Sequence, residues 1–513
     1  MDAFTQLFEK GRNGPCRPWP RVEVSAAEWT ALTGHLVAGD LVLMGLWGDA
    51  GVVHMALREE GGGRLAVATC PCPDGTFPSV ARHHAPAARL ERTVRDLFGL
   101  VAEGAPDPRP WLDHGRWGVR HPLGTSVRAE PAGDANVVLA ADAYPFLAAE
   151  GEGLHQIPVG PVHAGIIEPG HFRFSCYGET VVRLEGRLGY VHKGIEGLMA
   201  GADIAQAARL AGRQSGDSTV AYALAFCRAV EAARGIVVPE RAHALRAVMA
   251  ELERLANHLG DIGGICNDAA FALMLAHCGV LRELVLRASA RGFGHRLMMD
   301  KVVPGGVACD LAPEGVAALR ALVAHVRAAF PALVELYDNT ASLQDRTVGT
   351  GFTRPDHVRQ FGAGGYVGRA SGRAFDARRS LPYPPYDRLP FEVAGRTEGD
   401  VNARVWVRIR EVEESLGLIV RLLDTLPAGP VLAELNGTGE GRAGEGLAVV
   451  EGFRGDVLAF VALGAGGRVR RAHLRDPSWF QWPLLETAIE GNIVADFPLC
   501  NKSFNCSYSG VDL

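Results

Sequence analysis

Residues 251–263 read ELERLANHLGDIG and lie within a longer stretch, residues 240–299, in which apolar side chains recur at helical spacing. Most of these apolar residues are small or aliphatic, which is typical of long helices packed in a bundle. Residues 313–337 and 401–426 show the same pattern, and Pro313 suits the first turn of its helix. The sequence therefore predicts a core of long packed helices.

Short apolar runs on both sides of this helical region predict β-strands. Residues 41–47 and 52–57 flank the turn sequence GDAG, which is typical of a hairpin, and residues 64–69 add a third strand. A helix is expected over residues 87–98. Towards the C-terminus, two apolar runs flank the sequence GAGG of residues 464–467 and predict a second, smaller sheet.

The length of 513 residues exceeds what one hydrophobic core usually supports, so we expect more than one domain. Residues 124–153 are rich in alanine, glycine and acidic side chains and are interpreted as a linker. The sequence thus predicts an α+β fold. A small α/β domain is expected at residues 1–123, and a mostly helical domain closed by a small β-sheet at residues 154–513.

Composition and charge exclude several classes of protein. The net charge of −6, with no cluster of lysine and arginine, argues against nucleic-acid binding. No apolar run reaches the roughly 18 to 20 residues of a membrane span, and no signal peptide is recognisable. Ten scattered cysteines favour a reducing, cytoplasmic setting. Any association with a membrane is then expected to pass through partner subunits.

Two stretches look like places where a metal-binding Cys-x-x-Cys pair would belong, although neither contains one. They are GRQSGDS at residues 212–218 and SFNCSYSGVDL at residues 503–513. Ser215 and Ser218 keep the spacing of such a pair without its thiols. We expect the two stretches to meet in the folded chain.

The second half of the N-terminal unit resembles a known family. The sequences LERTVRDLFGL (residues 90–100), PDPRPWL (106–112) and HPL (121–123) are similar to the 30-kDa, or C-type, subunit of NADH:quinone oxidoreductase, complex I. The alternative interpretation is an amphipathic helix with a proline-rich exit, which would say nothing about function.

The remainder of the chain resembles the large subunit of energy-converting NiFe hydrogenases, including the formate hydrogenlyase and hydrogenase-4 types. It resembles the 49-kDa, or D-type, subunit of complex I nearly as well. The blocks that carry this resemblance occur in the same order over most of the chain: residues 157–174, 190–199, 251–263, 294–296, 304–306, 369–372, 399–404 and 451–455. The resemblance implies a chain in which the 30-kDa and 49-kDa types are fused.

In the hydrogenase family, nickel is held by four cysteine thiolates from two Cys-x-x-Cys pairs, a soft ligand set that suits this metal. The resemblance places these ligands at Ser215, Ser218, Ser507 and Gly510, so all four thiols are missing. We therefore expect no metal site and no nickel-iron centre. Two nearby thiols, Cys500 and Cys506, are interpreted as packed residues.

Complex I offers a second comparison, because there the corresponding cavity binds the quinone headgroup. The resemblance places the two headgroup-binding side chains, a histidine and a tyrosine, at Ile167 and Gly216, so neither is kept. His163 matches a different histidine of the same turn. Quinone binding in this chain is therefore an expectation that rests on the resemblance alone.

The two stretches define a candidate cavity. Its candidate catalytic residues are His163, Glu196, Arg213 and Asp217, and its candidate cofactor-binding residues are Ser215, Ser218, Ser507, Tyr508 and Gly510. A pair formed by Arg213 and Asp217 beside hydroxyl groups could bind a small polar group or relay protons. Alternatively, it could be a satisfied network that holds two helices in register. His171 and His192 are interpreted as turn and cap residues.

The resemblance implies an oxidoreductase subunit in the peripheral arm of a membrane-associated complex, which reduces quinone or another small acceptor. We expect no redox cofactor on this chain. The expected partners are a small iron-sulfur subunit and antiporter-like membrane subunits, at the cytoplasmic face of the membrane. The alternative is a non-catalytic scaffold that couples conformational change to ion pumping. The family is associated with NAD, but no Gly-x-Gly-x-x-Gly in a strand-turn-helix setting predicts NADH binding here.

Overall fold

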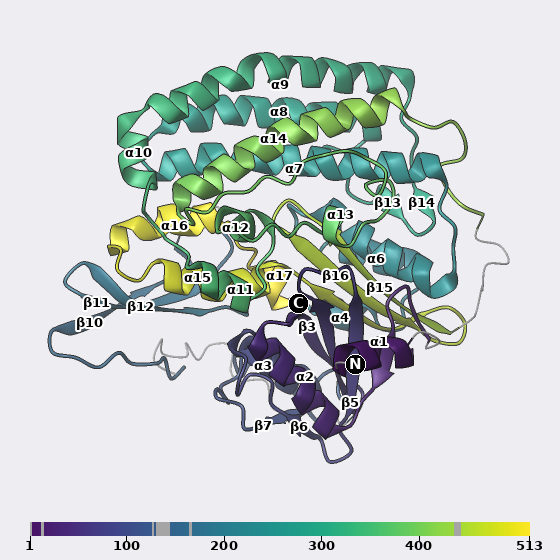
Figure 1. The fold of residues 1–513 in the computed structure, drawn as a ribbon, viewed down its shortest axis with the longest axis vertical. Coiled ribbons are helices and arrows are strands. Elements are labelled where there is room, and N and C mark those ends of the chain that lie inside the picture. The colour runs from purple at the N-terminus through teal and green to yellow at the C-terminus, as the bar shows by residue number, and fades with distance from the viewer. Residues whose placement is uncertain (1–2, 12–14, 126–127, 130–143, 164–166, 435–442) are drawn as a thin grey trace.

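The computed structural model describes residues 3–11, 15–125, 128–129, 144–163, 167–434 and 443–513. The predicted long helices form a bundle along one side of the molecule (Figure 1). Its members are α7 (Glu240–Asp268), α8 (Ala272–Phe293), α9 (Pro313–Asn339) and α14 (Val401–Asp424). Helix α7 packs against both α8 and α14 and is buried on nearly every side, so it forms the centre of the core.

Local sequence explains where the bundle helices begin and end. The Asp400 side chain accepts a hydrogen bond from the amide of Ala403 and caps the N-terminus of α14. Gly294, with a φ of 75°, ends α8 in a left-handed conformation that favours glycine. Helix α9 is the one described helix that is long and apolar enough to cross a membrane by length and composition, criteria that the core helix of a soluble protein also meets.

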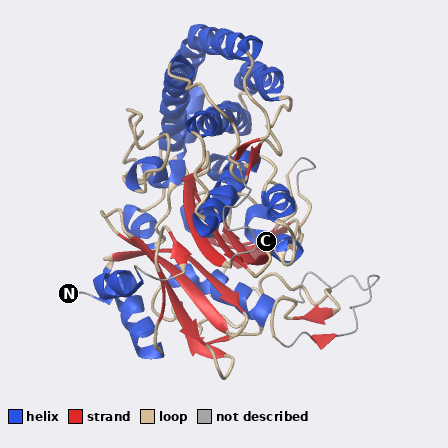
Figure 2. Cartoon of the chain, turned by 90° about the vertical axis from the view of Figure 1, so that its right-hand side faces the viewer, coloured by secondary structure: helices blue, strands red, loops and turns tan. Residues whose placement is uncertain are grey.

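The two predicted sheets pack against each other. The N-terminal sheet has the order β2 (Arg21–Glu23), β5 (Leu65–Pro71), β4 (Val52–Glu59), β3 (Leu41–Asp49), and its antiparallel hairpin is the predicted one. The second sheet has the order β1 (Cys16–Arg17), β15 (Gly444–Glu451), β16 (Asp456–Leu463), β17 (Val469–Arg475). Figure 2 shows the strands of both sheets gathered beneath the helical bundle.

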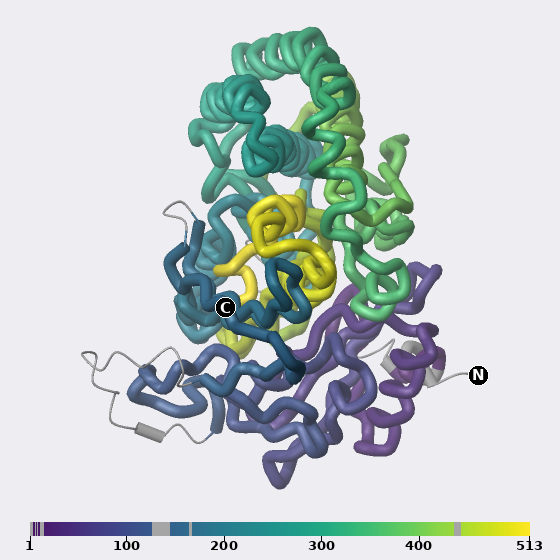
Figure 3. The backbone as a smooth tube through the Cα atoms, turned by 90° about the vertical axis from the view of Figure 1, so that its left-hand side faces the viewer, coloured from purple at the N-terminus to yellow at the C-terminus, as the bar shows by residue number. Residues whose placement is uncertain are grey.

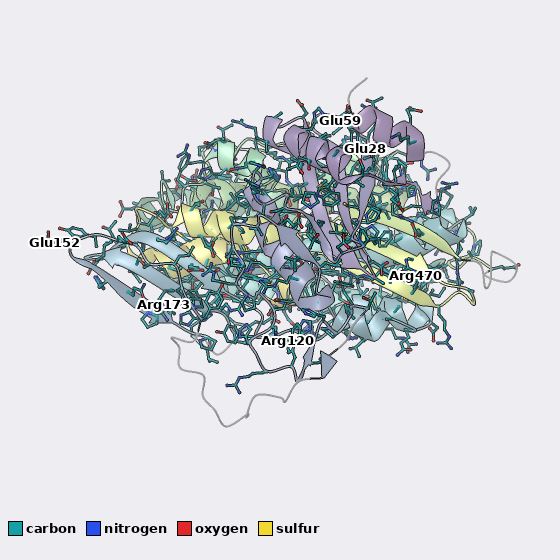
Figure 4. The ribbon with its side chains drawn as sticks, turned by 90° about the horizontal axis from the view of Figure 1, so that it is seen from below. Glu28, Glu59, Arg120, Glu152, Arg173 and Arg470 are labelled. Carbon is teal, nitrogen blue, oxygen red and sulfur yellow. The ribbon has the colours of Figure 1, made fainter. Side chains whose placement is uncertain are left out.

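A shared core joins the two sheets. Strand β3 is buried along its whole length, because its other face packs against β16 and β17. Trp47 of β3 stacks on His473 of β17 with 4.8 Å between ring centroids, and β1 adds itself in parallel to β15. Arg470 of β17 pairs with Asp49 at the edge of this junction (Figure 4). The N-terminal unit therefore shares apolar packing with the C-terminal one.

A third, three-stranded antiparallel sheet projects from one end of the molecule. It consists of β10 (Leu154–Val159), β11 (His171–Tyr177) and β12 (Thr180–Arg187). Glu152, just before β10, lies at its outer end, and Arg173 on β11 lies closer to the body of the molecule (Figure 4). The predicted linker at residues 124–153 lies largely outside the described residues.

Shorter elements complete the chain. They are α1 (Ala3–Gly11), α2 (Ala26–Ala38), β6 (Thr76–Pro78), η1 (Ala85–Ala87), α3 (Ala88–Phe98), β7 (Val101–Glu103), β8 (Val119–Arg120), β9 (Arg128–Ala129), α4 (Ile195–Met199), α5 (Ile204–Ala211), α6 (Thr219–Arg234), β13 (Val302–Val303), β14 (Gly306–Val307), α10 (Ala341–Thr347), α11 (Pro355–Gln360), α12 (Gly365–Ala370), α13 (Ala377–Ser380), α15 (Ser478–Ala488), η2 (Val494–Asp496), α16 (Phe497–Phe504) and α17 (Ser509–Asp512). Helix α3 is the predicted helix of the N-terminal unit.

A buried ionic network ties the bundle to the C-terminal sheet. Arg369 of α12 has no exposed surface and donates to Glu411 of α14 (2.9 Å) and to Glu451 of β15 (2.8 Å). His258 of α7 contacts the same Glu411 carboxylate through Nε2, at 2.6 Å. Four elements that are distant in sequence therefore depend on one compensated cluster of charges.

We expect Arg369→Met to lower the free energy of unfolding by about 3–5 kcal/mol, because it leaves the Glu411 and Glu451 carboxylates without their buried counter-charge. Arg410→Met on helix α14 is the control. It removes an exposed pair with Glu413 and should cost less than about 1 kcal/mol. Thermal and denaturant unfolding of the two variants measure the difference, and equal losses would contradict the assigned role of the network.

Candidate functional site

The two stretches predicted to meet do meet. Residues 212–218 connect α5 to α6, and residues 503–513 contain the end of α16 and all of α17, the yellow segment enclosed between the bundle and the N-terminal unit in Figure 3. Ser215 Oγ and Ser507 Oγ are hydrogen-bonded at 2.9 Å. Gln214 Nε2 also donates to the Ser509 carbonyl oxygen at 3.0 Å. Side-chain hydrogen bonds thus hold the two stretches together.

Several donors converge on the Asp217 carboxylate. Ser215 Oγ donates to Oδ1 at 2.9 Å and Ser218 Oγ at 3.1 Å. Arg454 reaches both carboxylate oxygens, at 3.2 Å and 2.5 Å. Burial by itself would raise the pKa of Asp217, but the Arg454 guanidinium holds that pKa below its ordinary value. Asp217 is therefore ionised near neutral pH.

The partner of Asp217 differs from the predicted one. Arg213 turns away from the cluster and binds Asp300 through both terminal nitrogens, at 2.7 and 2.8 Å, with its side chain 38% exposed. The predicted pairing of Arg213 with Asp217 is therefore wrong. Arg454 takes that place from the turn between β15 and β16, where its side chain is almost completely buried.

Glu196 also lies outside the cluster. Its carboxylate accepts hydrogen bonds from Arg471 Nη1 (2.7 Å), from the Leu474 amide (3.0 Å) and from His473 Nδ1 (2.8 Å). Although burial raises the pKa of Glu196, Arg471 and His473 lower it to about 2. These partners sit at the junction of the two sheets, so Glu196 belongs to the contact between the N-terminal and C-terminal units.

Tyr508, which belongs to the C-terminal stretch, forms a separate aromatic group with His163. The Tyr508 hydroxyl lies 3.5 Å from His163 Nε2, and His163 stacks on Phe172 with 5.5 Å between centroids. Burial lowers the pKa of His163 and raises that of Tyr508. Ile167, where the resemblance places a headgroup-binding histidine, is 40% exposed.

The predicted turn and cap histidines lie at loop contacts. His171 Nδ1 lies 3.2 Å from the Gly160 carbonyl oxygen. His192 Nδ1 lies 2.5 Å from the Asp512 carbonyl oxygen. Both contacts are to backbone oxygens, so each ring holds a connecting segment in place.

The ligand positions that the resemblance implies do not fit a four-thiolate metal centre. The hydroxyl groups of Ser215 and Ser507 bind each other directly, and the Ser507 hydroxyl also accepts a hydrogen bond from the Gly510 amide at 2.9 Å. Cys506 is buried, and burial raises its pKa, so it stays a thiol. Within the part of the chain that the structure describes, no group of three or more His, Cys, Asp or Glu side chains is arranged to hold a metal ion.

A cavity of about 330 Å³ adjoins the Asp217 cluster. Its lining residues come from the start of α6, from α7, from α8 and from the segment after α8: Gly216, Asp217, Thr219, Leu252, Glu253, Ala256, Asn257, Arg282, Leu286, Ser289, Arg296, Leu297 and Met298. The Asp217 side chain keeps 37% of its surface exposed. A Cβ atom placed on Gly216 would meet nothing within 4 Å. The absence of a side chain at position 216 thus leaves open space beside the cluster.

Glu253 is a second carboxyl group on this cavity. Its two oxygens accept hydrogen bonds from the amides of Val220 (2.7 Å) and Ala221 (3.1 Å) in the first turn of α6. Burial raises the pKa of Glu253 to about 8, although the hydrogen bonds from the two amides lower it. Asn257 Nδ2 donates to the backbone oxygens of Glu253 and Asp217 and so ties the backbone of α7 to that of the segment before α6.

Sequence reasoning missed Glu253, Arg454 and Asp476 as site residues. Glu253 and Arg454 lie inside blocks 251–263 and 451–455, which carried the resemblance, but no spacing or motif within those blocks singled these two residues out. Asp476 directly follows β17 and accepts a hydrogen bond from Tyr222 at 2.6 Å. Only the fold brings these three residues to the predicted stretches.

Comparisons with known proteins agree with this architecture. The 30-kDa subunit model of the respiratory-chain NADH dehydrogenase matches residues 38–132, and the 49-kDa subunit model matches residues 268–439. The chain is 33% identical to formate hydrogenlyase subunit 5 of Escherichia coli over 85% of its length and 77% of that protein's. It is 28% identical to the C/D subunit of NADH-quinone oxidoreductase of Bacteroides fragilis over 87% of each chain.

A solved structure gives the same result. A chain of the archaeal membrane-bound sulfane sulfur reductase, a respiratory membrane complex, superimposes with a TM-score of 0.66 at 26% identity and covers 71% of this chain and 100% of that one. The fold and these relatives are those of an oxidoreductase subunit that works within a membrane-associated complex. The chain belongs to the family of fused 30-kDa and 49-kDa subunits that links NADH-quinone oxidoreductase with the large subunits of energy-converting hydrogenases.

We expect Asp217→Asn to lower the free energy of unfolding at pH 7 by about 1–2 kcal/mol, because it weakens the ion pair with Arg454. This value is smaller than that of a fully buried ion pair because the Asp217 carboxylate is partly exposed. The pKa of Asp217 in the folded protein lies below its ordinary value of 3.8. The carboxylate therefore contributes its full stabilisation above pH 3.8, and this stabilisation is lost as the pH falls through the folded-state pKa. Thermal unfolding of both proteins from pH 7 to pH 3 should show the difference shrinking in acid. A difference that stays constant with pH would contradict the assignment.

Proposed function

We propose that this chain is the acceptor-reducing subunit of its complex and that the cavity beside Asp217 binds quinone or another small electron acceptor. The observation that carries the proposal is the cavity itself, because it places open space and polar groups beside the Asp217 carboxylate. Its volume of about 330 Å³ lies at the lower end of the roughly 300–1,000 Å³ of small-molecule sites.

The cavity lining suits a compact and largely apolar acceptor. Leu252, Ala256, Leu286, Leu297 and Met298 supply apolar walls, and the carboxyl groups belong to two further lining residues, Asp217 and Glu253. Arg282 lines the same cavity and has no hydrogen-bonding or ionic partner among the residues that the structure describes, so it is available to donate to an acceptor's oxygen or sulfur. The open space at Gly216 gives such a molecule access to the Asp217 cluster.

One carboxyl group on the cavity is ionised and the other is protonated, which supports a reduction of the acceptor that is coupled to proton transfer. Asp217 is kept charged by Arg454, whereas Glu253 holds its proton up to about pH 8. Neighbouring groups whose pKa values are driven apart are a common arrangement for acid and base roles. We assign Glu253 as the proton donor to the reduced acceptor and Asp217 as the fixed negative charge that keeps Arg454 in place.

The electrons must come from a partner, because no side chain of this protein is a redox cofactor. The proposed donor is a small iron-sulfur subunit whose cluster faces this cavity, and the proposed membrane partners are antiporter-like subunits at the cytoplasmic face. Relatives named as NADH-quinone oxidoreductase and as a sulfane sulfur reductase support quinone and sulfane sulfur as acceptor classes. The rival proposal is a scaffold, in which the cavity is inert and the subunit only couples conformational change to pumping.

We expect Gly216→Phe to raise the KM for the acceptor at least tenfold in the assembled complex, because the ring would fill the open space beside Asp217. Gly34→Phe on the exposed side of α2 is the matched control, since a side chain there also meets nothing within 4 Å. Steady-state reduction of a short-chain benzoquinone measures both variants. Unchanged kinetics in Gly216→Phe would favour the scaffold.

We expect Glu253→Gln to lower kcat by about 10²-fold or more, the usual contribution of a general acid. In the unmodified protein, turnover should fall as the pH rises through about 8, because Glu253 then loses the proton it donates. The glutamine variant should lose this alkaline decline, and pH profiles from 6 to 9.5 would show it. If the decline persists in the variant, another group supplies the proton.

A further inference from the structure

The backbone of Gly510 lies against the side chain of Asp476. A Cβ atom on Gly510 would lie 2.6 Å from both Cγ and Oδ2 of Asp476, and 2.9 Å from Cβ of Ser507. Contacts of a Cβ atom below 3.0 Å essentially never occur in proteins. Position 510, where the resemblance places the fourth nickel ligand, therefore has no room for any side chain while Asp476 keeps its place.

Asp476 is held firmly in that place. Its Oδ2 accepts the Tyr222 hydroxyl at 2.6 Å, and its Oδ1 accepts the Ser478 amide at 2.8 Å. Asp476 is 1% exposed and Tyr222 is completely buried. Moving the carboxylate would leave a buried hydroxyl and a buried amide without partners, which proteins rarely tolerate.

Charge explains why a carboxylate is stable at this point. Arg454 is 3% exposed, and a buried guanidinium needs compensating negative charge. Both Asp217 and Asp476 act on it and raise its pKa. In a four-thiolate centre, sulfur ligands supply negative charge at this site. Here the Asp476 carboxylate supplies part of the negative charge, and it lies beside Gly510, where the resemblance places the fourth thiolate.

We infer that the Asp476 carboxylate has taken the space and the charge of the fourth metal-ligand side chain. Two features thus prevent a nickel-type centre from forming. Thiols are missing at Ser215, Ser218 and Ser507, and the space beside Gly510 is filled. Replacement of the first three by cysteine is nearly isosteric, whereas the fourth position cannot accept cysteine unless Asp476 changes as well. This inference is independent of which acceptor the neighbouring cavity binds.

Thermal unfolding of alanine variants tests the steric part. Gly510→Ala should lower the Tm by several degrees, and the same change should cost less when Asp476→Ala is already present. Gly216→Ala is the matched control, because its new Cβ meets open space and should leave the Tm within about one degree. Equal losses from Gly510→Ala with and without Asp476→Ala would overturn the inference.

Cobalt binding tests the consequence for metals. The full chain carrying Ser215→Cys, Ser218→Cys, Ser507→Cys and Gly510→Cys is titrated with Co²⁺, with and without Asp476→Ala, and thiolate-to-cobalt charge-transfer absorption is recorded. We expect the variant with Asp476→Ala to bind one Co²⁺ per chain at least tenfold more tightly than the variant that keeps Asp476. Equal affinity in the two variants, whatever its value, would overturn the inference.

Discussion

Compensation of buried arginines is the constraint on which this structure depends. Arg369, Arg404, Arg408 and Arg454 are 3% exposed or less, and a guanidinium cannot be deprotonated to escape burial. Each must therefore find carboxylates, hydroxyls or carbonyl oxygens inside the protein. Because these partners lie on different elements, every buried arginine fixes several segments relative to one another.

The candidate site follows from the same constraint. Arg408 binds Asp261 of α7 and the Ser503 carbonyl oxygen, and Arg404 donates to the Ser503 hydroxyl. These bonds hold α16 against α7 and α14 at the point where the C-terminal stretch begins. Arg454 then reaches Asp217, so the two ligand-like stretches meet at a position that buried cations have already set. The hydroxyl contact between Ser215 and Ser507 is a result of this placement.

Much of the fold could be predicted from the sequence, because helical periodicity and apolar runs report burial directly. The bundle helices, both hairpins and α3 lie where these patterns put them. The shared core of the two sheets could not be predicted, because an alternating or fully apolar strand does not say which surface covers its second face. Strand β3 is buried on both faces, and only the folded chain shows that β16 and β17 are responsible.

The candidate site could also be predicted only in part. The resemblance to the hydrogenase large subunit predicted that residues 212–218 and 503–513 meet. The choice between Arg213 and Arg454 as the partner of Asp217 depended on side-chain direction, which sequence neighbourhood does not determine.

A site that is shaped like a metal centre but has no ligand thiols needs other groups to supply the charge and the volume of those ligands. In this chain, hydroxyl groups at Ser215 and Ser507 close on each other, and a carboxylate at Asp476 stands beside a bare backbone. Nearby, Arg404 binds Ser503 and Arg408 binds Asp261, and neither of these partners is a ligand position, so these contacts do not depend on thiols there. The space that remains open lies beside Asp217, next to Gly216 and Glu253, and the proposed chemistry is assigned to this cavity and not to the ligand positions that the resemblance implies.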